Sequence, residues 1–267
     1  MKCLHHIILI LPLSLLLSLS NLHAQHARFL SSGIIHYDKQ VNMFAAISSR
    51  MINNDGRNSF GEEMYENYKS SQPQFKTFPY ELSFSGDLSS FKPLEDPNKT
   101  VSDWNYLERD PVIDQKNTVY ADLKKQTRLS KKNIYDEWFV VSDSLRPVRW
   151  KLTDEHREIA GYDCRRANGL TMDSVYVVAF YTDQIPVSGG PDSFHGLPGM
   201  ILGLVMPHEH ITFFATKIND QDVPAASITA PQEKKIISKP EFIKKMNDLF
   251  EDWRGNYTNT LRKAIFL

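Results

Sequence analysis

An apolar run of seven residues, 200–206, is the feature that most constrains how this chain folds. A polar turn follows at 207–210, and residues 211–218 return to a strand-like pattern. The tetrapeptide before the run, 197–200, fits a type II turn, because its proline presets φ and its glycine supplies a positive φ. The segment therefore predicts an antiparallel hairpin with both arms in the core of a sheet.

The rest of the second half continues this β character. β-Branched and aromatic residues are dense there, and the turns between them carry Asn, Asp, Gly or Pro. Besides the hairpin, we predict strands at 118–123, 137–141, 149–152, 162–167 and 174–182. The strand at 174–182 contains the run VYVVAFY, which predicts a central strand covered on both faces.

The first half is mixed. Residues 32–46 begin with strand character, 60–70 have helical spacing, and 78–85 return to a strand. Residues 91–116 are rich in Pro, Asp and Asn and predict a long surface loop. The expected fold class is mainly β, of the α+β type: a curved antiparallel sheet with a few helices.

A helix near 239–253 is well signalled. Ser238 can cap it, and Glu241 three residues later completes a capping box. An apolar stripe follows at helical spacing and predicts that this helix packs on the sheet. The stripe consists of Phe242, Met246, Leu249 and Trp253.

Residues 1–24 have the order of a cleavable signal peptide. Lys2 precedes fourteen uncharged residues, 7–20, and a polar stretch then ends at the small residue Ala24. A spanning helix needs about 20 apolar residues, so this run is short for an anchor. We expect residues 25–267 to form a single exported domain that spans no membrane. Cleavage removes Cys3 and leaves Cys164 without an internal partner; we favour a buried, inert thiol over an intermolecular disulfide or a soft metal ligand.

The charge balance excludes one class of partner. Thirty-one Lys and Arg against 32 Asp and Glu give a net charge of −1. No field of one sign is available to attract nucleic acid. We therefore expect no nucleic-acid partner.

Several motifs occur in the order of a known family. The chain contains RWKLTDE at 149–155, IAGYDCRRA at 159–167, FYTDQIP at 180–186, and GP and GLPGMIL within 190–202. This pattern resembles the GLPGLI family of exported Gram-negative proteins. Met200 departs from the usual Leu, a volume-conserving change. The motif residues are Trp150, Gly161, Tyr162, Cys164, Tyr181, Pro186, Gly190, Pro191, Gly196, Leu197, Pro198 and Gly199.

The resemblance implies a protein of the periplasm or cell surface with no established activity. The family pattern is also similar to lipoprotein-carrier-like folds, in which a curved sheet wraps around helices. Its motif residues are Gly, Pro and aromatics, which account for a fold better than for a reaction.

Two chemical alternatives remain open. Asp192, Ser193 and His195 lie close in sequence and suggest a hydrolase, although the Gly-x-Ser-x-Gly elbow is absent. His208 and His210, with His195, suggest a copper or zinc site of a metal-handling accessory protein, to which Met200, Met206 and Cys164 could add soft ligands.

The sequence nevertheless favours a protein without catalytic residues or a cofactor. We expect it to bind a small ligand or an unknown envelope protein through the hollow or the edge of its sheet.

Overall fold

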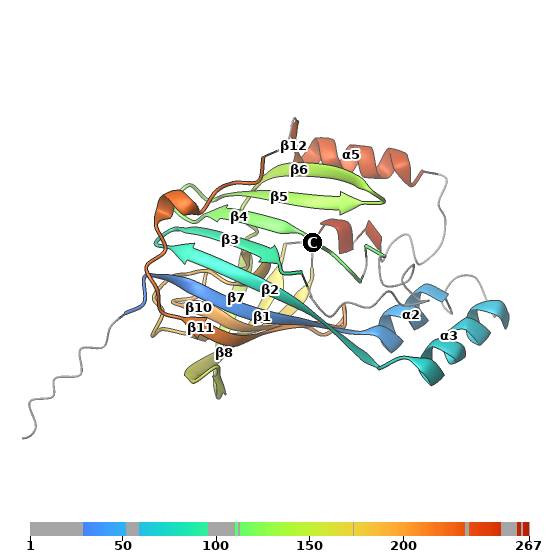
Figure 1. The fold of residues 1–267 in the computed structure, drawn as a ribbon, viewed down its shortest axis with the longest axis horizontal. Coiled ribbons are helices and arrows are strands. Elements are labelled where there is room, and N and C mark those ends of the chain that lie inside the picture. Colours follow the sequence, from blue (N-terminus) through green and yellow to red (C-terminus); the bar gives the residue numbers. More distant parts are fainter. Residues whose placement is uncertain are drawn as a thin grey trace, which may run out of the picture.

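A single twelve-stranded sheet dominates the computed structural model (Figure 1). The structure describes residues 29–51, 59–95, 110–111, 113–172, 174–232, 235–251, 261–262 and 264–266. The predicted signal peptide lies outside these residues. The strand order is β12-β6-β5-β4-β3-β2-β1-β11-β10-β9-β8-β7.

All neighbouring strands are antiparallel except β12 and β6, which pair in parallel. The predicted fold class, a mainly β protein with a large antiparallel sheet and few helices, is therefore confirmed. The strands are β1 Ser32–Asn42, β2 Phe75–Ser85, β3 Leu88–Pro93, β4 Thr118–Asp122, β5 Thr127–Ile134, β6 Glu137–Ser144, β7 Val148–Ile159, β8 Tyr162–Thr171, β9 Tyr176–Thr182, β10 Met200–Met206, β11 Ile211–Asn219 and β12 Ile236–Ser238. The α-helices are α2 Met43–Met51, α3 Ser59–Ser71 and α5 Lys239–Leu249, and two 3₁₀ helices are η2 Pro191–Ser193 and η3 Ala225–Ser227.

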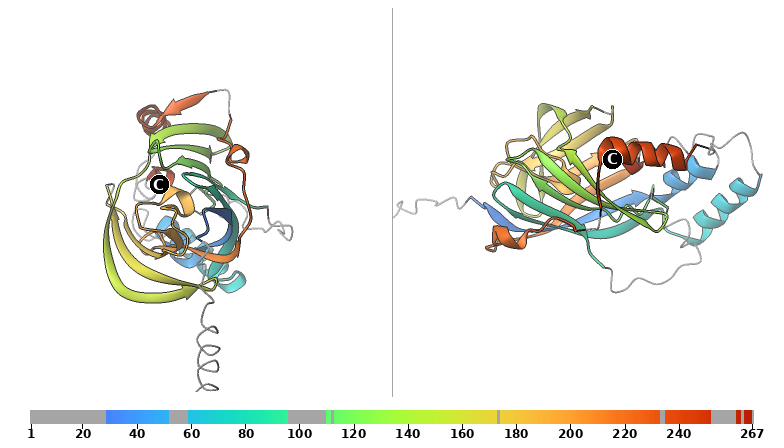
Figure 2. Two further views of the ribbon diagram at one scale, coloured as in Figure 1. Left: turned by 90° about the vertical axis from the view of Figure 1, so that its left-hand side faces the viewer. Right: turned by 90° about the horizontal axis from the view of Figure 1, so that it is seen from above.

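The short connection between β6 and β7 requires the sheet to be strongly curved. β6 lies second from one edge and β7 forms the other edge, yet only residues 145–147 separate them in the chain. An extended chain covers at most about 14 Å between Ser144 and Val148, so the two ends of the sheet must approach each other at this corner. Figure 2 shows the result, a trough whose walls curve around other parts of the chain.

The trough encloses two apolar clusters. The larger one joins the inner faces of β1–β3 and β8–β11 to α2, with Ile35 and Tyr37 among its fully buried members. The smaller one joins β5 and β6 to α5 and to the segment 261–266, which contributes Leu261 and Ile265.

The helix α5 begins where the sequence predicts. The Ser238 hydroxyl accepts the Glu241 N–H at 3.3 Å, which confirms the N-cap. Phe242 and Met246 are buried as expected. The predicted stripe is wrong at Leu249, which is 50% exposed, whereas the next residue, Phe250, is buried in the smaller cluster. Trp253 lies outside the described residues.

The predicted hairpin is confirmed as β10 and β11, with Met206 opposite Ile211. The predicted type II turn before it is wrong. Such a turn needs φ near +80° at its glycine, whereas Gly199 has φ 158°. The Met200 N–H donates to the Ile185 carbonyl at 3.0 Å instead of closing the turn.

Several further elements differ from the sequence expectations. The prediction missed α2, β3, β5 and β12, and the strand predicted at 78–85 begins earlier, at Phe75. The expected surface loop 91–116 is partly interior, since Asp110 and Ile113 are 4% and 2% exposed. Residues 96–109 and 112 of that loop lie outside the described residues. No described helix is long and apolar enough to cross a bilayer.

Candidate functional site

The family-motif loop folds back into the trough. η2 contacts β3, β4 and β10, and Phe194 and Leu197 are almost fully buried. A Cβ at Gly190 would lie 2.7 Å from the Cβ of Ile201, so this position needs glycine. Pro191 is buried, and Pro186 is exposed where the loop enters. These motif residues build the interior of the fold.

Trp150 holds the end of this loop. Its indole N–H donates to the His195 carbonyl at 2.8 Å. The same ring nitrogen would lie 3.3 Å from a Cβ on Gly196, which also has φ +95°. Gly196 thus allows the ring of Trp150 to approach the backbone of the motif loop closely.

The motif around Cys164 is structural as well. Ala160 and Gly161, with φ 51° and 83°, form the two-residue connection between Ile159 and Tyr162, a geometry typical of a type I′ hairpin. Cys164 is fully buried, and burial raises the pKa of its thiol to about 12. Such a thiol carries almost no thiolate, its nucleophilic form, at neutral pH.

The suggested hydrolase residues do not form a relay. The Ser193 hydroxyl accepts a hydrogen bond from Arg128 Nη1 at 3.2 Å. His195 Nδ1 lies 3.3 Å from the Ser193 carbonyl oxygen, not from the hydroxyl. The carboxylate of Asp192 acts electrostatically on two buried lysines, Lys39 and Lys132. Asp192, Ser193 and His195 therefore do not have the geometry of a catalytic triad.

The three suggested histidine ligands are not brought together. His208 and His210 are exposed in the turn after β10, whereas His195 precedes that strand. Within the described ranges, no three His, Cys, Asp or Glu side chains are grouped closely enough to hold a metal ion.

The interior of the trough is filled by the chain itself. Lys39 donates to the Ile113 carbonyl at 3.0 Å, and Lys132 donates to the Ile265 carbonyl at 2.9 Å. Two small pockets beside these lysines have volumes of ≈ 10 Å³ each, about the space of one water molecule. Neither of these two pockets has room for the small ligand expected in the hollow of the sheet.

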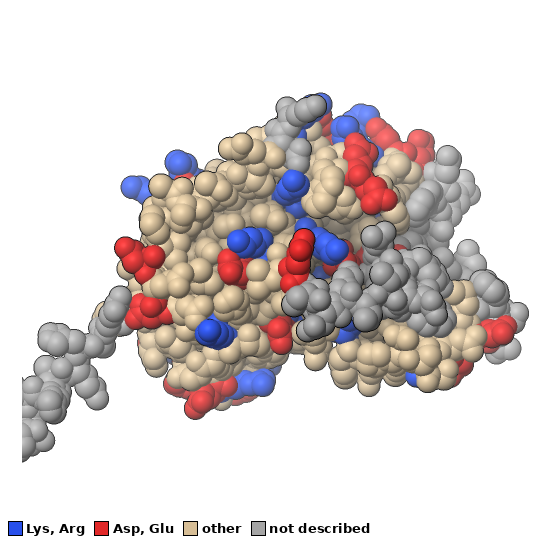
Figure 3. Space-filling view, in the orientation of Figure 1, with Lys and Arg blue, Asp and Glu red and all other residues tan. Residues whose placement is uncertain are grey.

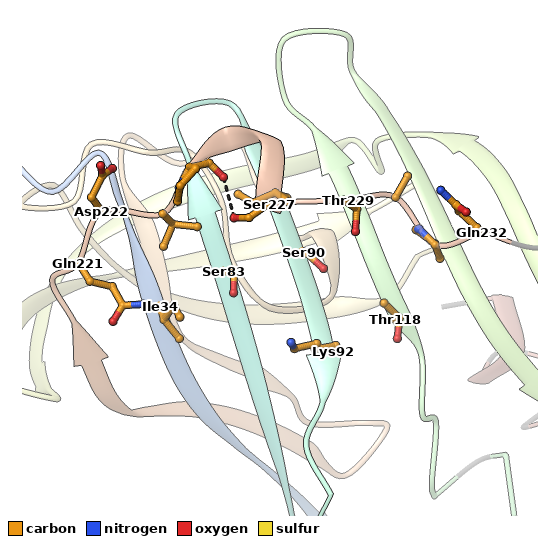
Figure 4. A pocket seen from close by; sticks show the side chains of 15 residues that line it. Ile34, Ser83, Ser90, Lys92, Thr118, Gln221, Asp222, Ser227, Thr229 and Gln232 are labelled. Atoms are coloured by element: carbon orange, nitrogen blue, oxygen red, sulfur yellow. Dashed lines mark hydrogen bonds between the residues drawn. The ribbon is translucent and has the colours of Figure 1, made fainter.

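A much larger space lies on the outer face of the sheet. Residues 220–232, here called the strap, leave β11 and cross over β1–β4 on the way to β12 (Figure 4). Val223 and Ile228 are 7% and 6% exposed and anchor the strap. Between strap and sheet lies the strap groove, with a volume of ≈ 600 Å³. Its lining residues are Ile34, Ser83, Ser90, Lys92, Thr118, Gln221, Asp222, Val223, Pro224, Ser227, Ile228, Thr229, Ala230, Pro231 and Gln232.

Cross-strand pairs make the floor of the strap groove polar and nearly neutral. Ser83 on β2 lies opposite Ser90 on β3. Lys92 lies opposite Glu81, with Nζ and Oε1 3.2 Å apart, and the Ser83 hydroxyl donates to the same carboxylate oxygen at 3.2 Å. The lysine charge is thus balanced locally, and the rest of the lining combines Ser, Thr and Gln side chains with apolar residues of the strap.

A second groove meets the first at Thr118, which lines both. Its volume is ≈ 610 Å³, and its walls include the core residue Tyr80 and the exposed Trp138. Trp138 is 50% exposed, and Lys131 lies over its ring at 4.7 Å from the centroid. Acidic and basic side chains are interspersed over this side of the molecule, without a broad area of one sign (Figure 3).

Sequence reasoning missed both grooves. The strand residues of the strap groove occupy outer positions of alternating strands, where Ser and Thr resemble ordinary solvated residues. The only available signal was the spacing of Ser83, Ser90 and Lys92 on two consecutive strands, and it does not show that a strap crosses above them.

One family model matches part of the chain. A family model described as "Protein of unknown function (Porph_ging)" matches residues 169–203. The matched family has no known function. The stretch includes the motif residues Tyr181, Pro186 and Gly199. No curated protein matches the chain significantly.

One similar solved structure is entitled "Structure of PNGF-II in P21 space group". It superimposes with a TM-score of 0.47 at 14% sequence identity, and the match covers 80% of this chain and 33% of the other. The chain thus spans about a third of that structure's length. A TM-score below 0.5 carries no argument about function.

Proposed function

We propose that the protein is a non-enzymatic binding protein of the cell envelope that holds an uncharged saccharide in the strap groove. The observation that carries the proposal is the groove itself, ≈ 600 Å³ of open space whose lining includes hydroxyl and amide side chains from both the sheet and the strap. Binding sites are usually concave and contain a few converging polar groups. An exported location is part of the proposal and rests on the signal-peptide pattern of residues 1–24.

The chemistry of the floor favours a saccharide over a peptide strand. An extended peptide is usually captured through backbone hydrogen bonds at a free sheet edge. Here the floor is the face of β1–β4, whose backbone groups already bond neighbouring strands. Recognition falls to side-chain hydroxyls and amides such as Ser83, Ser90 and Gln232, which suit a ligand with many hydroxyl groups.

The charge balance supports an uncharged ligand. Lys92, the only cation among the described residues of the lining, is paired with Glu81. An anionic polymer would find no unbalanced positive charge there, and a cationic one would meet only Asp222. The adjoining groove with its exposed Trp138 offers an aromatic surface for a longer ligand.

A glycan array followed by calorimetry tests the proposal. Neutral oligosaccharides should bind, and Ser90→Trp should fill the floor and weaken binding by about tenfold or more. Ser142→Trp is the matched control, because Ser142 is exposed on β6 and does not line the groove. The proposal fails if no neutral saccharide binds or if both variants lose affinity equally.

A further inference from the structure

An interior pocket between β5, β6 and α5 has an unusual charge balance. It is lined by Arg128, Ser130, Lys132, Val141, Asp143, Lys239, Phe242, Ile265 and Phe266. Three of these residues are cationic and one is a carboxylate. Arg128 and Lys132 are each only 5% exposed, so their charges are removed from bulk water. Buried charges without a partner of opposite sign are costly, so a bound anion would be stabilised in this pocket.

The one carboxylate is already engaged. Asp143 Oδ2 accepts from Arg128 Nη2 at 3.0 Å and lies 3.3 Å from Lys239 Nζ. Its Oδ1 accepts the Ser144 N–H at 2.9 Å. Asp192 lies near enough to act on Lys132, but Arg146 does so with the opposite sign. Among the described residues, the surroundings therefore leave an excess of positive charge.

A buried donor at this pocket has no acceptor. Arg128 Nη1 bonds to Ser193 and Nη2 to Asp143, whereas the buried Nε has no hydrogen-bond partner in the described part of the chain. A buried N–H without an acceptor is rare in proteins, and an unobserved ion or water is a usual explanation.

The size of the pocket limits the occupant. Its volume of ≈ 10 Å³ has room for about one water molecule or one monatomic ion. Lys239 and Phe242 belong to the first turn of the eleven-residue helix α5, so the positive end of that helix lies beside the pocket. Helix end, cations and free N–H all favour an anion over neutral water.

We propose that this pocket binds a small monovalent anion of the chloride type, which accepts the Arg128 Nε–H and balances Lys132 and Lys239. The anion joins β5 and β6 to α5 and to the segment 261–266. The site is separate from the strap groove and does not depend on saccharide binding.

Two measurements test the anion site in the intact protein. Crystals grown in sodium bromide should show an anomalous peak within hydrogen-bond distance of Arg128 Nε. The melting temperature should rise saturably when chloride replaces gluconate at constant ionic strength, since a ligand of the folded state stabilises it. A water molecule in the pocket, with bromide bound only elsewhere, overturns the proposal.

A pair of variants on α5 separates this site from general salt effects. Lys239→Gln removes one lining cation and should shift the chloride midpoint several-fold to higher concentration. Lys244→Gln removes the same charge from the same helix, but its side chain is 77% exposed and paired with Asp248. It should leave the midpoint unchanged. Equal midpoints in the two variants contradict the proposal.

Discussion

The ring of Trp150 leaves no room for a side chain on Gly169, its cross-strand partner. The two residues face each other on β7 and β8, and a Cβ on Gly169 would lie 2.5 Å from Cζ3 of the indole. Aromatic residues often cover strand glycines in this way. Because the indole also donates to the His195 carbonyl, this contact connects the edge of the sheet to the motif loop.

Gly169→Ala should therefore destabilise the protein by about 1–3 kcal/mol, the usual cost of overpacking an interior. The new methyl group would displace Trp150 and meet Val177 Cγ2 at 2.8 Å. Urea denaturation followed by tryptophan fluorescence measures the change. Gly189→Ala is the control, because its Cβ would meet other atoms only at 3.6 Å or more. Equal stabilities of the two variants would contradict the packing role of Trp150.

Gly199→Ala should be more damaging. A Cβ on Gly199 would collide with the carbonyl oxygen of Thr182, a backbone atom of β9 that cannot rotate away. We expect a loss of about 3 kcal/mol or more, or a failure to fold. Met200→Leu, at the neighbouring position, conserves volume and should cost less than about 1.5 kcal/mol. Thermal unfolding of both variants distinguishes the steric role of Gly199 from a general sensitivity of this segment.

Local patterns were sufficient to predict much of the sheet. The hairpin of β10 and β11 follows from two apolar runs around a polar turn, and α5 follows from Ser238 and Glu241. These features depend on neighbours in sequence. By contrast, β5 contains Arg128 and Lys132, which look like solvent-facing residues until Ser193 and the Ile265 carbonyl are placed beside them.

The site was harder to predict than the fold for the same reason. The strap groove arises because residues 220–232 cross strands that lie far away in sequence. The motif residues were conspicuous in sequence, yet they serve packing: Gly199 accommodates the Thr182 carbonyl, and Trp150 covers Gly169. The type II turn prediction was wrong because Met200 bonds to Ile185, a partner that the tetrapeptide alone does not reveal.

Cys164 should be unreactive in the native protein. It is fully buried, and its thiol pKa of about 12 leaves little thiolate at pH 8. A disulfide reagent such as Ellman's should therefore react slowly with the native protein, at a rate limited by opening of the fold. In guanidinium chloride, where the chain is unfolded, the reaction should be fast. A rapid stoichiometric reaction under native conditions would contradict this assignment and revive a redox role.

Two buried lysines should make stability rise with pH. Burial lowers the pKa of Lys132 to about 7 and that of Lys39 to about 8, from 10.5. Between these values and 10.5 the unfolded chain binds more protons than the folded one. The free energy of unfolding therefore increases with pH, by up to about 1.4 kcal/mol per pH unit for each lysine.

Replacing one of these lysines shows how much it contributes to the pH dependence of stability. In Lys132→Met the unfolding free energy should rise less steeply with pH between about pH 7 and pH 10. The slope should fall by about 1.4 kcal/mol per pH unit, the contribution of one proton. Urea denaturation in low-chloride buffer measures it, since a bound anion would favour the charged lysine. Lys92→Met is the control, because the Lys92 side chain is 50% exposed on the outer face. If Lys132→Met keeps the slope of the wild type, Lys132 titrates as an ordinary surface lysine and its interior position is wrong.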